Sequence, residues 1–308
     1  EEKLHGAVIG HDGREDARSF TETAQVGLRL EALAEITAVK REKQAAIVHD
    51  WQNKWALEGS CGPRNAGMGY WDELKRHYNA LAREGIAVEF VDQNADLTGY
   101  GLVVVPMLYL LTDAFAKKLC AFAQNGGTVI VTYWSGVVDE SDLCRLGDTP
   151  YGLTELLGLR RTEIDGMYDG ESRRCMPAAG CTLPAAQAST LCEVAALDEK
   201  DPAEPLSLYD EDYFAGHPAA AVHRYGKGRA YYLASRFDEA FYRAFYHDAA
   251  KEIGLSPAWP EALPEGVLAV RRGSFMFVQN CTEQPVTVGN TVLARYRTAV
   301  WKDRDRIF

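Results

Sequence analysis

The sequence predicts an α/β protein with a parallel central sheet, followed by a small C-terminal all-β domain. Residues 101–108 (GLVVVPML) and 128–134 (TVIVTYW) are continuous apolar runs, each short enough to form a strand that is buried on both faces. Between them, Phe115, Leu119 and Phe122 recur at the spacing of one helix face. Strand, helix and strand in this order form a βαβ unit, because parallel neighbours need a crossover connection.

The ends of this unit carry the matching local signals. The Thr112 hydroxyl is placed to cap the helix N-terminus, and the Gly126-Gly127 pair ends the helix. A polar loop at residues 135–140 (SGVVDE) follows the second strand. This loop lies at the carboxyl end of a strand, where open α/β sheets usually bind their ligands.

Composition excludes several classes of protein. The chain has 308 residues, enough for about two domains, and a net charge of −11, which opposes binding to nucleic acid. No apolar run reaches the roughly 18 residues of a membrane span, and there is no signal-peptide pattern. The seven cysteines are odd in number and scattered, as expected for reduced thiols. We therefore expect a cytoplasmic protein without nucleic-acid or membrane partners and, because it begins at Glu1 without methionine, a fragment.

The N-terminal region, residues 1–40, is predicted to contain loop and one helix. Residues 1–18 hold three glycines and show no clean period. Ser19 is predicted to cap a helix that runs to about Val39. Four consecutive charged residues, 40–43 (KREK), mark the first predicted domain boundary.

The α/β domain is predicted to begin with a strand at residues 44–50 (QAAIVHD). Residues 51–69, which include Trp51 and Trp55, are predicted to form a long loop. Loops of this length without structure of their own tend to be functional or to cover something.

Residues 70–84 form the next predicted helix, with Trp71 and Leu74 on its buried face and Gly85 at its end. A strand follows at residues 86–91 (IAVEFV). The βαβ unit described above then completes this half of the domain.

The second half of the domain differs from the first in composition and in its predicted elements. A short helix is predicted at residues 151–159, and residues 160–228, rich in Pro, Gly and Ala, are predicted to form an irregular β insertion. Residues 229–235 (RAYYLAS) are expected to rejoin the main sheet. A helix that Asp238 caps and Gly254 closes ends the domain.

Residues 255–266 contain three prolines and are predicted to be a linker. In the unit that follows this linker, apolar and polar residues alternate and turn signals separate the segments, which is typical of a small all-β structure. At about 40 residues it is too small to be stable alone, so it should lie against the larger domain. Its predicted strands are residues 267–270, 275–280 and 285–288.

A flavodoxin-like sheet invites a search for the nucleophile of class I glutamine amidotransferases. That chemistry needs a thiol on a tight strand-to-helix elbow, with a histidine as its base. The candidate elbows, residues 105–107 and 133–136, hold no cysteine, and Ser135 lies in no G-x-S-x-G pattern. We therefore expect no catalysis by this domain and a fold kept for packing and association. The alternative is a self-standing amidotransferase-like enzyme or a small-molecule-binding domain.

The sequence predicts no metal site and no cofactor. Cys175, Cys181 and Cys192 are spaced by six and eleven residues, and no C-x-x-C occurs. The glycine-rich turn at residues 226–228 (GKG) lacks the surrounding pattern of a phosphate-binding loop.

The order of these segments resembles the C-terminal half of glycoside hydrolase family 42, the β-galactosidases. Residues 2–8 (EKLHGAV) are similar to that family's E-K-x-H-x-A stretch after the last barrel strand. Three further segments resemble the middle domain of that family: residues 46–53 (AIVHDWQN), 125–140 (NGGTVIVTYWSGVVDE) and 153–165 (LTELLGLRRTEID). The small β unit after Gly266 is similar to its C-terminal domain.

This resemblance implies a domain organisation. Residues 1–40 would be the loop and last helix of a catalytic (β/α)8 barrel. Residues 41–258 would be an amidotransferase-like trimerisation domain, with the β insertion at about 160–228. Residues 259–308 would be the small β domain. The middle domain of this family mediates homotrimer formation.

The resemblance also implies a parent activity, the retaining hydrolysis of terminal β-D-galactosides by two carboxyl groups roughly 5–5.5 Å apart. Both carboxylates would precede the first residue, so the fragment alone is predicted to be inactive and to hold no catalytic residue. Carried over by position, Glu2 and His5 would hydrogen-bond galactose hydroxyls. Trp51 and Trp55 are candidate anchors of the homotrimer interface, because aromatic residues in surface loops favour interfaces. The alternative is that both cap the sheet of their own subunit.

Overall fold

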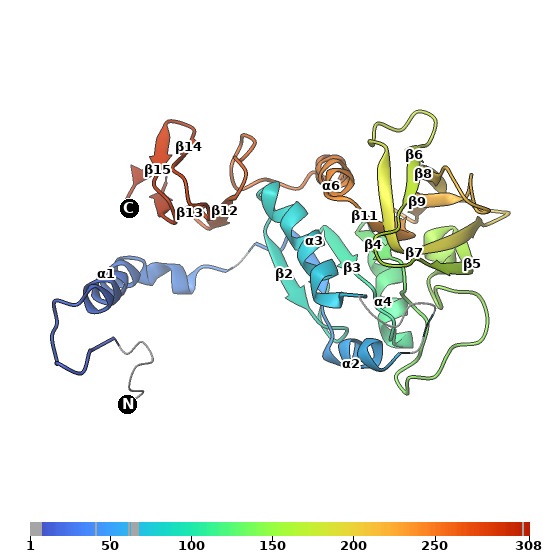
Figure 1. The fold of residues 1–308 in the computed structure, drawn as a ribbon, viewed down its shortest axis with the longest axis horizontal. Coiled ribbons are helices and arrows are strands. Elements are labelled where there is room, and N and C mark those ends of the chain that lie inside the picture. The colour runs from blue at the N-terminus through green and yellow to red at the C-terminus, as the bar shows by residue number, and fades with distance from the viewer. Residues whose placement is uncertain (1–7, 41, 61, 63–67, 304) are drawn as a thin grey trace.

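The computed structural model of the protein describes residues 8–40, 42–60, 62, 68–303 and 305–308. A central domain is built on one large sheet, and the N-terminal helical segment and the C-terminal β unit lie together on one side of it (Figure 1). Glu2 and His5, the predicted sugar-binding residues, lie outside the described residues.

The N-terminal segment consists of α1 (Arg18–Ala32) and a 3-10 helix (Ala34–Ala38). The prediction that Ser19 caps the helix is wrong, because the helix already begins one residue earlier. The cap position is Ala17, whose side chain makes no capping hydrogen bond. Within the described part of the chain, no residue of α1 is buried.

Five parallel strands form one half of the central sheet: β2 (Val88–Val91), β1 (Ala45–Val48), β3 (Leu102–Val105), β4 (Thr128–Thr132) and β10 (Gly228–Leu233). They follow one another across the sheet in that order, and every neighbouring pair is parallel. β1, β3 and β4 are buried along their whole length, as their continuous apolar runs predict.

Three longer helices pack on these strands: α3 (Tyr70–Arg83), α4 (Asp113–Gln124) and α6 (Glu239–Ile253). α3 contacts β1, β2 and α6, whereas α4 contacts β4 and β10. The predicted caps are confirmed, since the hydroxyl of Thr112 accepts a hydrogen bond from the Phe115 N–H and the carboxylate of Asp238 accepts one from the Phe241 N–H. Gly254 ends α6 with a left-handed backbone (φ 77°).

The other half of the central sheet contains antiparallel strands: β9 (Pro218–Tyr225), β8 (Glu204–Tyr209), β6 (Arg173–Pro177), β7 (Ala186–Leu197), β11 (Ser235–Phe237) and β5 (Leu159–Gly166). β9 pairs with β10, so both halves form one 11-stranded sheet. The predicted irregular insertion at residues 160–228 is therefore mostly regular structure. Gly170, Gly180 and Gly216 lie between strands, whereas Pro177 and Pro218 stand at strand ends and Pro205 lies in β8 beside a register shift. The short predicted helix before it is α5 (Thr154–Leu157). The sheet as a whole is mixed, which corrects the prediction of a parallel sheet.

A helix occupies the first half of the segment that the sequence predicts as a long loop. α2 (Trp51–Gly59) begins directly after β1. Asp50 caps it, because its carboxylate accepts hydrogen bonds from the backbone N–H groups of Gln52 (2.8 Å) and Asn53 (3.2 Å). The loop prediction is wrong here, since no Gly or Pro interrupts residues 51–58 and Asp50 supplies the cap.

The C-terminal unit holds two small antiparallel sheets, one of β12 (Val267–Arg272), β13 (Phe275–Asn280), β16 (Thr298–Lys302) and β17 (Asp305–Arg306), the other of β14 (Val286–Val288) and β15 (Thr291–Leu293). The three predicted strands are confirmed, and β15, β16 and β17 are additional. β12 contacts α3, and the Ala258 N–H donates a hydrogen bond to the Gly85 carbonyl at 2.8 Å. The unit therefore lies against the central domain, as expected.

Candidate functional site

The carboxyl ends of β3 and β4 carry tight turns at the two predicted elbows. Met107 (φ 43°) and Trp134 (φ 59°) both have left-handed backbone, which is uncommon for residues with a side chain. Met107 is fully buried, and its N–H donates a hydrogen bond to Thr132 Oγ1 at 2.8 Å. The structure therefore has the sharp turn of a nucleophile elbow, with a thioether at its tip.

Polar groups at these turns bond to one another inside the fold. Ser135 is fully buried, and its Oγ accepts a hydrogen bond from the Leu108 N–H at 3.0 Å. Asn53 of α2 donates from Nδ2 to the Met107 carbonyl (3.1 Å) and accepts at Oδ1 from the Leu110 N–H (3.0 Å). An oxyanion site needs N–H groups that face the substrate, and a nucleophilic serine needs a base beside it. The polar groups described at these turns bond to one another within the fold.

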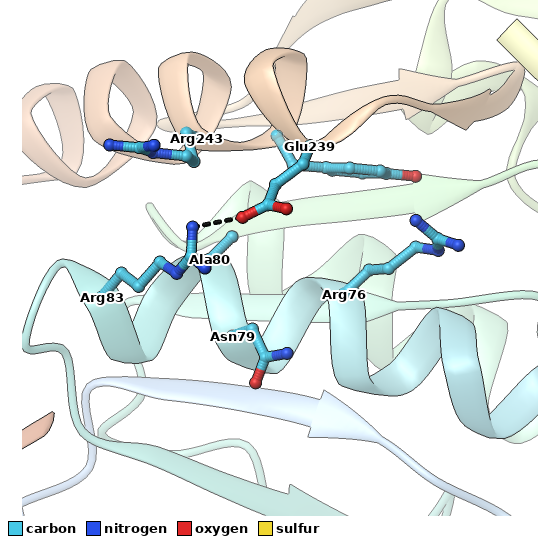
Figure 2. A pocket seen from close by; sticks show the side chains of 7 residues that line it. Arg76, Asn79, Ala80, Arg83, Glu239 and Arg243 are labelled. Atoms are coloured by element: carbon cyan, nitrogen blue, oxygen red, sulfur yellow. Dashed lines mark hydrogen bonds and ion pairs between the residues drawn. The ribbon is translucent and has the colours of Figure 1, made fainter. Parts of the chain in front are cut away.

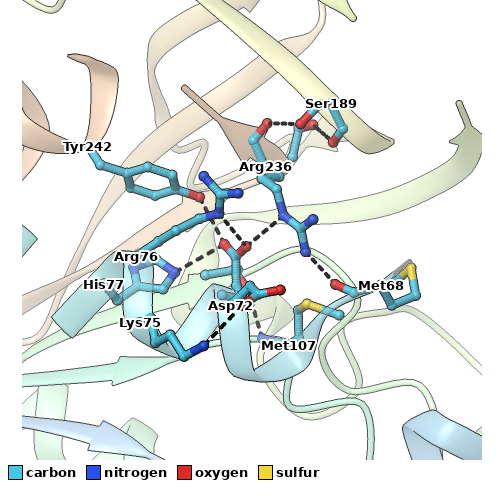
Figure 3. A network of polar contacts seen from close by, with 12 residues as sticks. Met68, Asp72, Lys75, Arg76, His77, Met107, Ser189, Arg236 and Tyr242 are labelled. Carbon is cyan, nitrogen blue, oxygen red and sulfur yellow. Dashed lines mark hydrogen bonds and ion pairs between the residues drawn. The ribbon is translucent and has the colours of Figure 1, made fainter. Parts of the chain in front are cut away.

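Glu73 of α3 is a buried carboxylate with Arg236, His77 and Tyr242 as partners. Figure 3 shows these three labelled side chains pointing toward one carboxylate. Its Oε2 accepts hydrogen bonds from Arg236 Nε at 2.8 Å and from the Tyr133 hydroxyl at 3.2 Å. Its Oε1 accepts one from the Tyr242 hydroxyl at 2.9 Å and lies 3.3 Å from His77 Nε2. Burial by itself would raise the pKa of Glu73, but the hydrogen bonds and charges of His77 and Arg236 lower it to about 2.

We call these five residues the Glu73 network. It joins α3, the turn after β4, β11 and α6. Arg236 extends it by donating from Nη2 to the Met68 carbonyl, and His77 Nδ1 lies 2.5 Å from the Tyr246 hydroxyl oxygen. Because Glu73 stays ionised at neutral pH and its partners are themselves buried, it is neither a proton donor nor an accessible base. The network is a structural cross-link.

The sequence analysis missed this network. Its one signal is the placement of Glu73 and His77 at positions i and i+4 on the buried face of α3, where apolar residues are expected. The same face explains a wrong prediction. Trp71 is 41% exposed and not buried, because Tyr70, Glu73 and Leu74 take the inward positions around it.

Trp71 joins the two predicted interface residues in an exposed cluster, which we call the tryptophan patch. Trp51 and Trp55 lie one turn apart on α2 and are 52% and 56% exposed. The ring centroids of Trp51 and Trp71 lie 5.8 Å apart, and those of Trp51 and Trp55 lie 6.2 Å apart. His49, at the end of β1, stacks on Trp71 at 4.7 Å, and burial lowers the pKa of this histidine. The structure thus brings the predicted pair together and adds a third tryptophan.

A second apolar surface, the 143–146 loop, follows β4. Leu143 and Leu146 are exposed, the latter by 92%. Arg145 between them folds back, with Nη1 2.8 Å from Asp113 Oδ1 and its guanidinium 4.3 Å from the centre of the Tyr151 ring. Because β1 and β4 are parallel strands of one sheet, α2 after β1 and this loop after β4 lie at the same carboxyl edge.

Metal and membrane sites were also sought within the described residues. In that part of the chain no group of three or more His, Cys, Asp or Glu side chains could hold a metal ion. Among the helices described there, none is both long and apolar enough to cross a bilayer.

Comparison with known proteins points to one family. Residues 43–256 match the family model described as the β-galactosidase trimerisation domain. The chain is 44% identical over 274 residues to β-galactosidase BglY of Alicyclobacillus acidocaldarius, covering 88% of this chain and 39% of that protein. It is 36% identical over 297 residues to β-galactosidase GalA of Bacillus licheniformis, covering 94% and 43%. The crystal structure of a β-galactosidase from Rahnella sp. R3 matches with a TM-score of 0.91 and 39% identity, covering 98% of this chain and 47% of that one. The chain thus spans about two fifths of the length of these curated relatives.

Proposed function

The chain belongs to the family of β-galactosidase trimerisation domains, and from this premise we propose that it is the non-catalytic C-terminal region of a retaining β-galactosidase of glycoside hydrolase family 42. The whole enzyme would hydrolyse terminal β-D-galactosides, and this region would serve mainly in homotrimer assembly. The observation that carries the assembly role is the tryptophan patch, which exposes three large aromatic side chains at the sheet edge where related folds place ligands.

The strand order supports an amidotransferase-like core for the proposed trimerisation domain. The order β2-β1-β3-β4-β10 follows the 2-1-3-4-5 order of flavodoxin-like sheets, whose ligands bind between the ends of the first and third strands. In this protein the N-terminal turn of α2 fills that crevice, since the buried Asn53 bonds to backbone groups of Met107 and Leu110. This favours association over the alternative of a small-molecule-binding domain.

The exposed face of α1 supports a division of the chain into three parts. Val26 and Leu30, which share one face at positions i and i+4, are each more than half exposed, and so is Leu28 on the opposite side of the helix. An apolar helix surface needs a partner, and the last helix of a barrel has one in the barrel sheet. The proposed parts are the end of a catalytic (β/α)8 barrel at residues 1–40, the trimerisation domain at residues 41–258 and the small β domain at residues 259–308.

The sugar site would be completed by the rest of the barrel. We expect both catalytic carboxylates to come from there, with Glu2 and His5 donating or accepting hydrogen bonds at galactose hydroxyls. No cofactor enters this chemistry. A cytoplasmic location without nucleic-acid or membrane partners remains part of the proposal.

A closed ring of three subunits requires that each subunit offer two different surfaces. The tryptophan patch would be one of them, with aromatic anchors of the kind that dominate interface energies. The 143–146 loop, which presents Leu143 and Leu146 at the same sheet edge, would be the other.

Light scattering on the full-length protein tests this assembly. We expect a trimer at micromolar concentration, and we expect Trp55→Glu to dissociate it while the circular dichroism spectrum stays unchanged. The matched control is Tyr168→Glu, which charges an aromatic residue that is 82% exposed on the antiparallel half. A monomer or dimer in the wild type would contradict homotrimer assembly. A trimer that stays intact in Trp55→Glu would show that the tryptophan patch is not part of the interface.

Activity assays with a chromogenic β-galactoside test the catalytic part. The 308-residue chain alone should be inactive, whereas the full-length enzyme should turn over. In the full-length enzyme, Glu2→Gln and His5→Ala should each lower kcat/KM by about tenfold, the effect of one lost hydrogen bond to the sugar. Turnover by the chain alone that survives repurification and is lost on mutating one of its residues would overturn the non-catalytic assignment.

A further inference from the structure

Charged side chains line two cavities that lie outside the tryptophan patch. In the groove between α3 and α6, Arg83 pairs with Glu239. This pair lies between Arg76 and Arg243, which point apart (Figure 2). The other cavity, of about 390 Å³, lies beside β9 where β8 begins. Its lining includes His223, a buried side chain whose Nε2 atom has no hydrogen-bond partner among the described residues.

The ring of His223 is held in one orientation. Its Nδ1 lies 3.0 Å from the carbonyl oxygen of Leu156, in the last turn of α5. Because a carbonyl can only accept, Nδ1 carries the proton and donates, and in the neutral ring Nε2 keeps a lone pair. Gly158 lies against the other side of this contact, since a Cβ atom there would stand 2.6 Å from Cδ2 of His223. The lone pair of Nε2 therefore has a fixed direction.

A carboxylate oxygen lies beside this lone pair. Oδ2 of Asp201 is 3.3 Å from Nε2 of His223, yet the two make no hydrogen bond, so the oxygen lies off the axis along which the ring nitrogen points. Two ligand atoms of a tetrahedral zinc ion, each roughly 2.0–2.2 Å from the metal, lie about 3.3 Å apart, and each is off the bond axis of the other. The separation and the misalignment both fit a metal ion between the two side chains.

The charges around the cavity also favour a cation. Its lining contains three carboxylates and two guanidiniums, those of Asp201, Glu204, Glu252, Arg224 and Arg229. Glu252 is neutralised by its ion pair with Arg229. Asp201 and Glu204 remain opposite Arg224, which leaves one net negative charge beside the neutral ring of the histidine.

We propose that His223 Nε2 and the carboxylate of Asp201 bind one divalent cation of the zinc class. Zinc takes imidazole and carboxylate ligands, and a ligating histidine usually donates its other ring N–H to an oxygen, as Nδ1 does here. Since the described residues hold no group of three candidate ligands, water from the cavity would fill the remaining coordination positions. The ion would tie the turn between β7 and β8, which carries Asp201, to β9.

Calorimetric titration of the full-length protein with zinc chloride in a non-chelating buffer tests this proposal. We expect the wild type to bind one more zinc ion per subunit than Asp201→Asn, or to bind that ion about tenfold more tightly or better. The side chain of Asp201 is 82% exposed, so the substitution should leave the fold intact. The matched control is Glu199→Gln, at an exposed carboxylate of the same turn, and it should bind zinc like the wild type. Wild-type binding by Asp201→Asn would overturn the site, as would an equal loss in Glu199→Gln.

Thermal unfolding with and without zinc gives a second measurement. A ligand that binds the folded state raises Tm, whereas zinc that binds cysteines of the unfolded chain affects every variant alike. The zinc-induced change in Tm should therefore be more positive in the wild type and Glu199→Gln than in Asp201→Asn and His223→Gln. Each protein is compared with its own zinc-free form, so a lower basal Tm of His223→Gln does not enter the comparison. Equal zinc-induced changes in all four proteins would identify a direct ion pair of His223 with Asp201 and would rule out the metal.

Discussion

The Glu73 network and the tryptophan patch lie at the same region of the sheet and invert the usual placement of residue types. The network buries Glu73 and His77 completely, whereas the patch exposes Trp51 and Trp55 by more than half. α3 contributes to both, since Trp71 stands only two residues before Glu73 and points to the opposite side. Polar groups are thus sealed inside, and large apolar groups face outward.

This contrast separates buried polar groups that bond to one another from exposed apolar groups that have no cover in the described part of this chain. A buried charge is tolerated only when partners surround it, and Glu73 has a guanidinium, two tyrosine hydroxyls and a histidine. Those partners fix its protonation, so it is not available to a substrate. The exposed tryptophans gain stability only when another surface covers them. The inner region cross-links the fold, and the outer region is the surface that we propose for contact with other chains.

Replacing Glu73 by Gln should give the largest effect on the inner region. The substitution leaves Arg236 buried without its counter-charge, so we expect the free energy of unfolding to fall by about 3–5 kcal/mol. Urea titration followed by circular dichroism measures the loss. Asp72→Asn is the control, because the surface pair of Asp72 with Lys75 is worth at most about 1 kcal/mol. Equal losses in both variants would show that the network is not a stabilising cross-link.

The pH dependence of stability tests whether the ionised form of Glu73 stabilises the fold. Folding lowers the pKa of Glu73 from 4.5 to about 2. The stability that its ionised form contributes is therefore present above about pH 4.5 and is lost as the pH falls toward 2. Between pH 5 and pH 2, the wild type should lose about 3 kcal/mol more than Glu73→Gln. Parallel curves for the two proteins would contradict a lowered pKa at this residue.

A smaller effect is expected where α2 begins, because this helix carries the patch. Asp50→Ala removes the cap that accepts hydrogen bonds from Gln52 and Asn53. We expect a loss of about 1 kcal/mol in the free energy of unfolding, together with weaker association, since Trp51 and Trp55 then lie on a frayed helix. Unfolding and light scattering on the same variant test both. A loss of stability without any change in association would separate α2 from the interface.

Trp55→Ser should have the smallest effect on the folded subunit. Its side chain is 56% exposed, so after extrapolation to low protein concentration the free energy of unfolding should change by no more than about 0.5 kcal/mol. Urea titrations over a dilution series provide this value. A loss comparable to that of Glu73→Gln would mean that the patch belongs to the core of its own subunit, which is the alternative that the sequence left open.

Much of the fold could be predicted because its signals are local. The buried runs that become β3 and β4, the cap at Thr112 and the paired signals at Asp238 and Gly254 all act between residues a few positions apart. Asp50 offers the same kind of local signal, an N-cap residue. The sequence still predicts a loop instead of α2, because several glycines follow later in the segment. The regular strands of residues 160–228 were missed because their pairing partners lie far away along the chain.

By itself, then, the sequence determined the βαβ core, the small β unit that follows it and the absence of a thiol nucleophile on both elbows, because these depend on residue type and near neighbours. The tertiary structure alone decided that Glu73 meets Arg236, 163 residues later, and that Trp71 joins Trp51 on the surface. It also decided that Arg76 of α3 and Arg243 of α6 line one groove. Helix periodicity gives each of these residues a face, but which face turns inward depends on the partner across the fold, and that partner is set by strand order and helix packing.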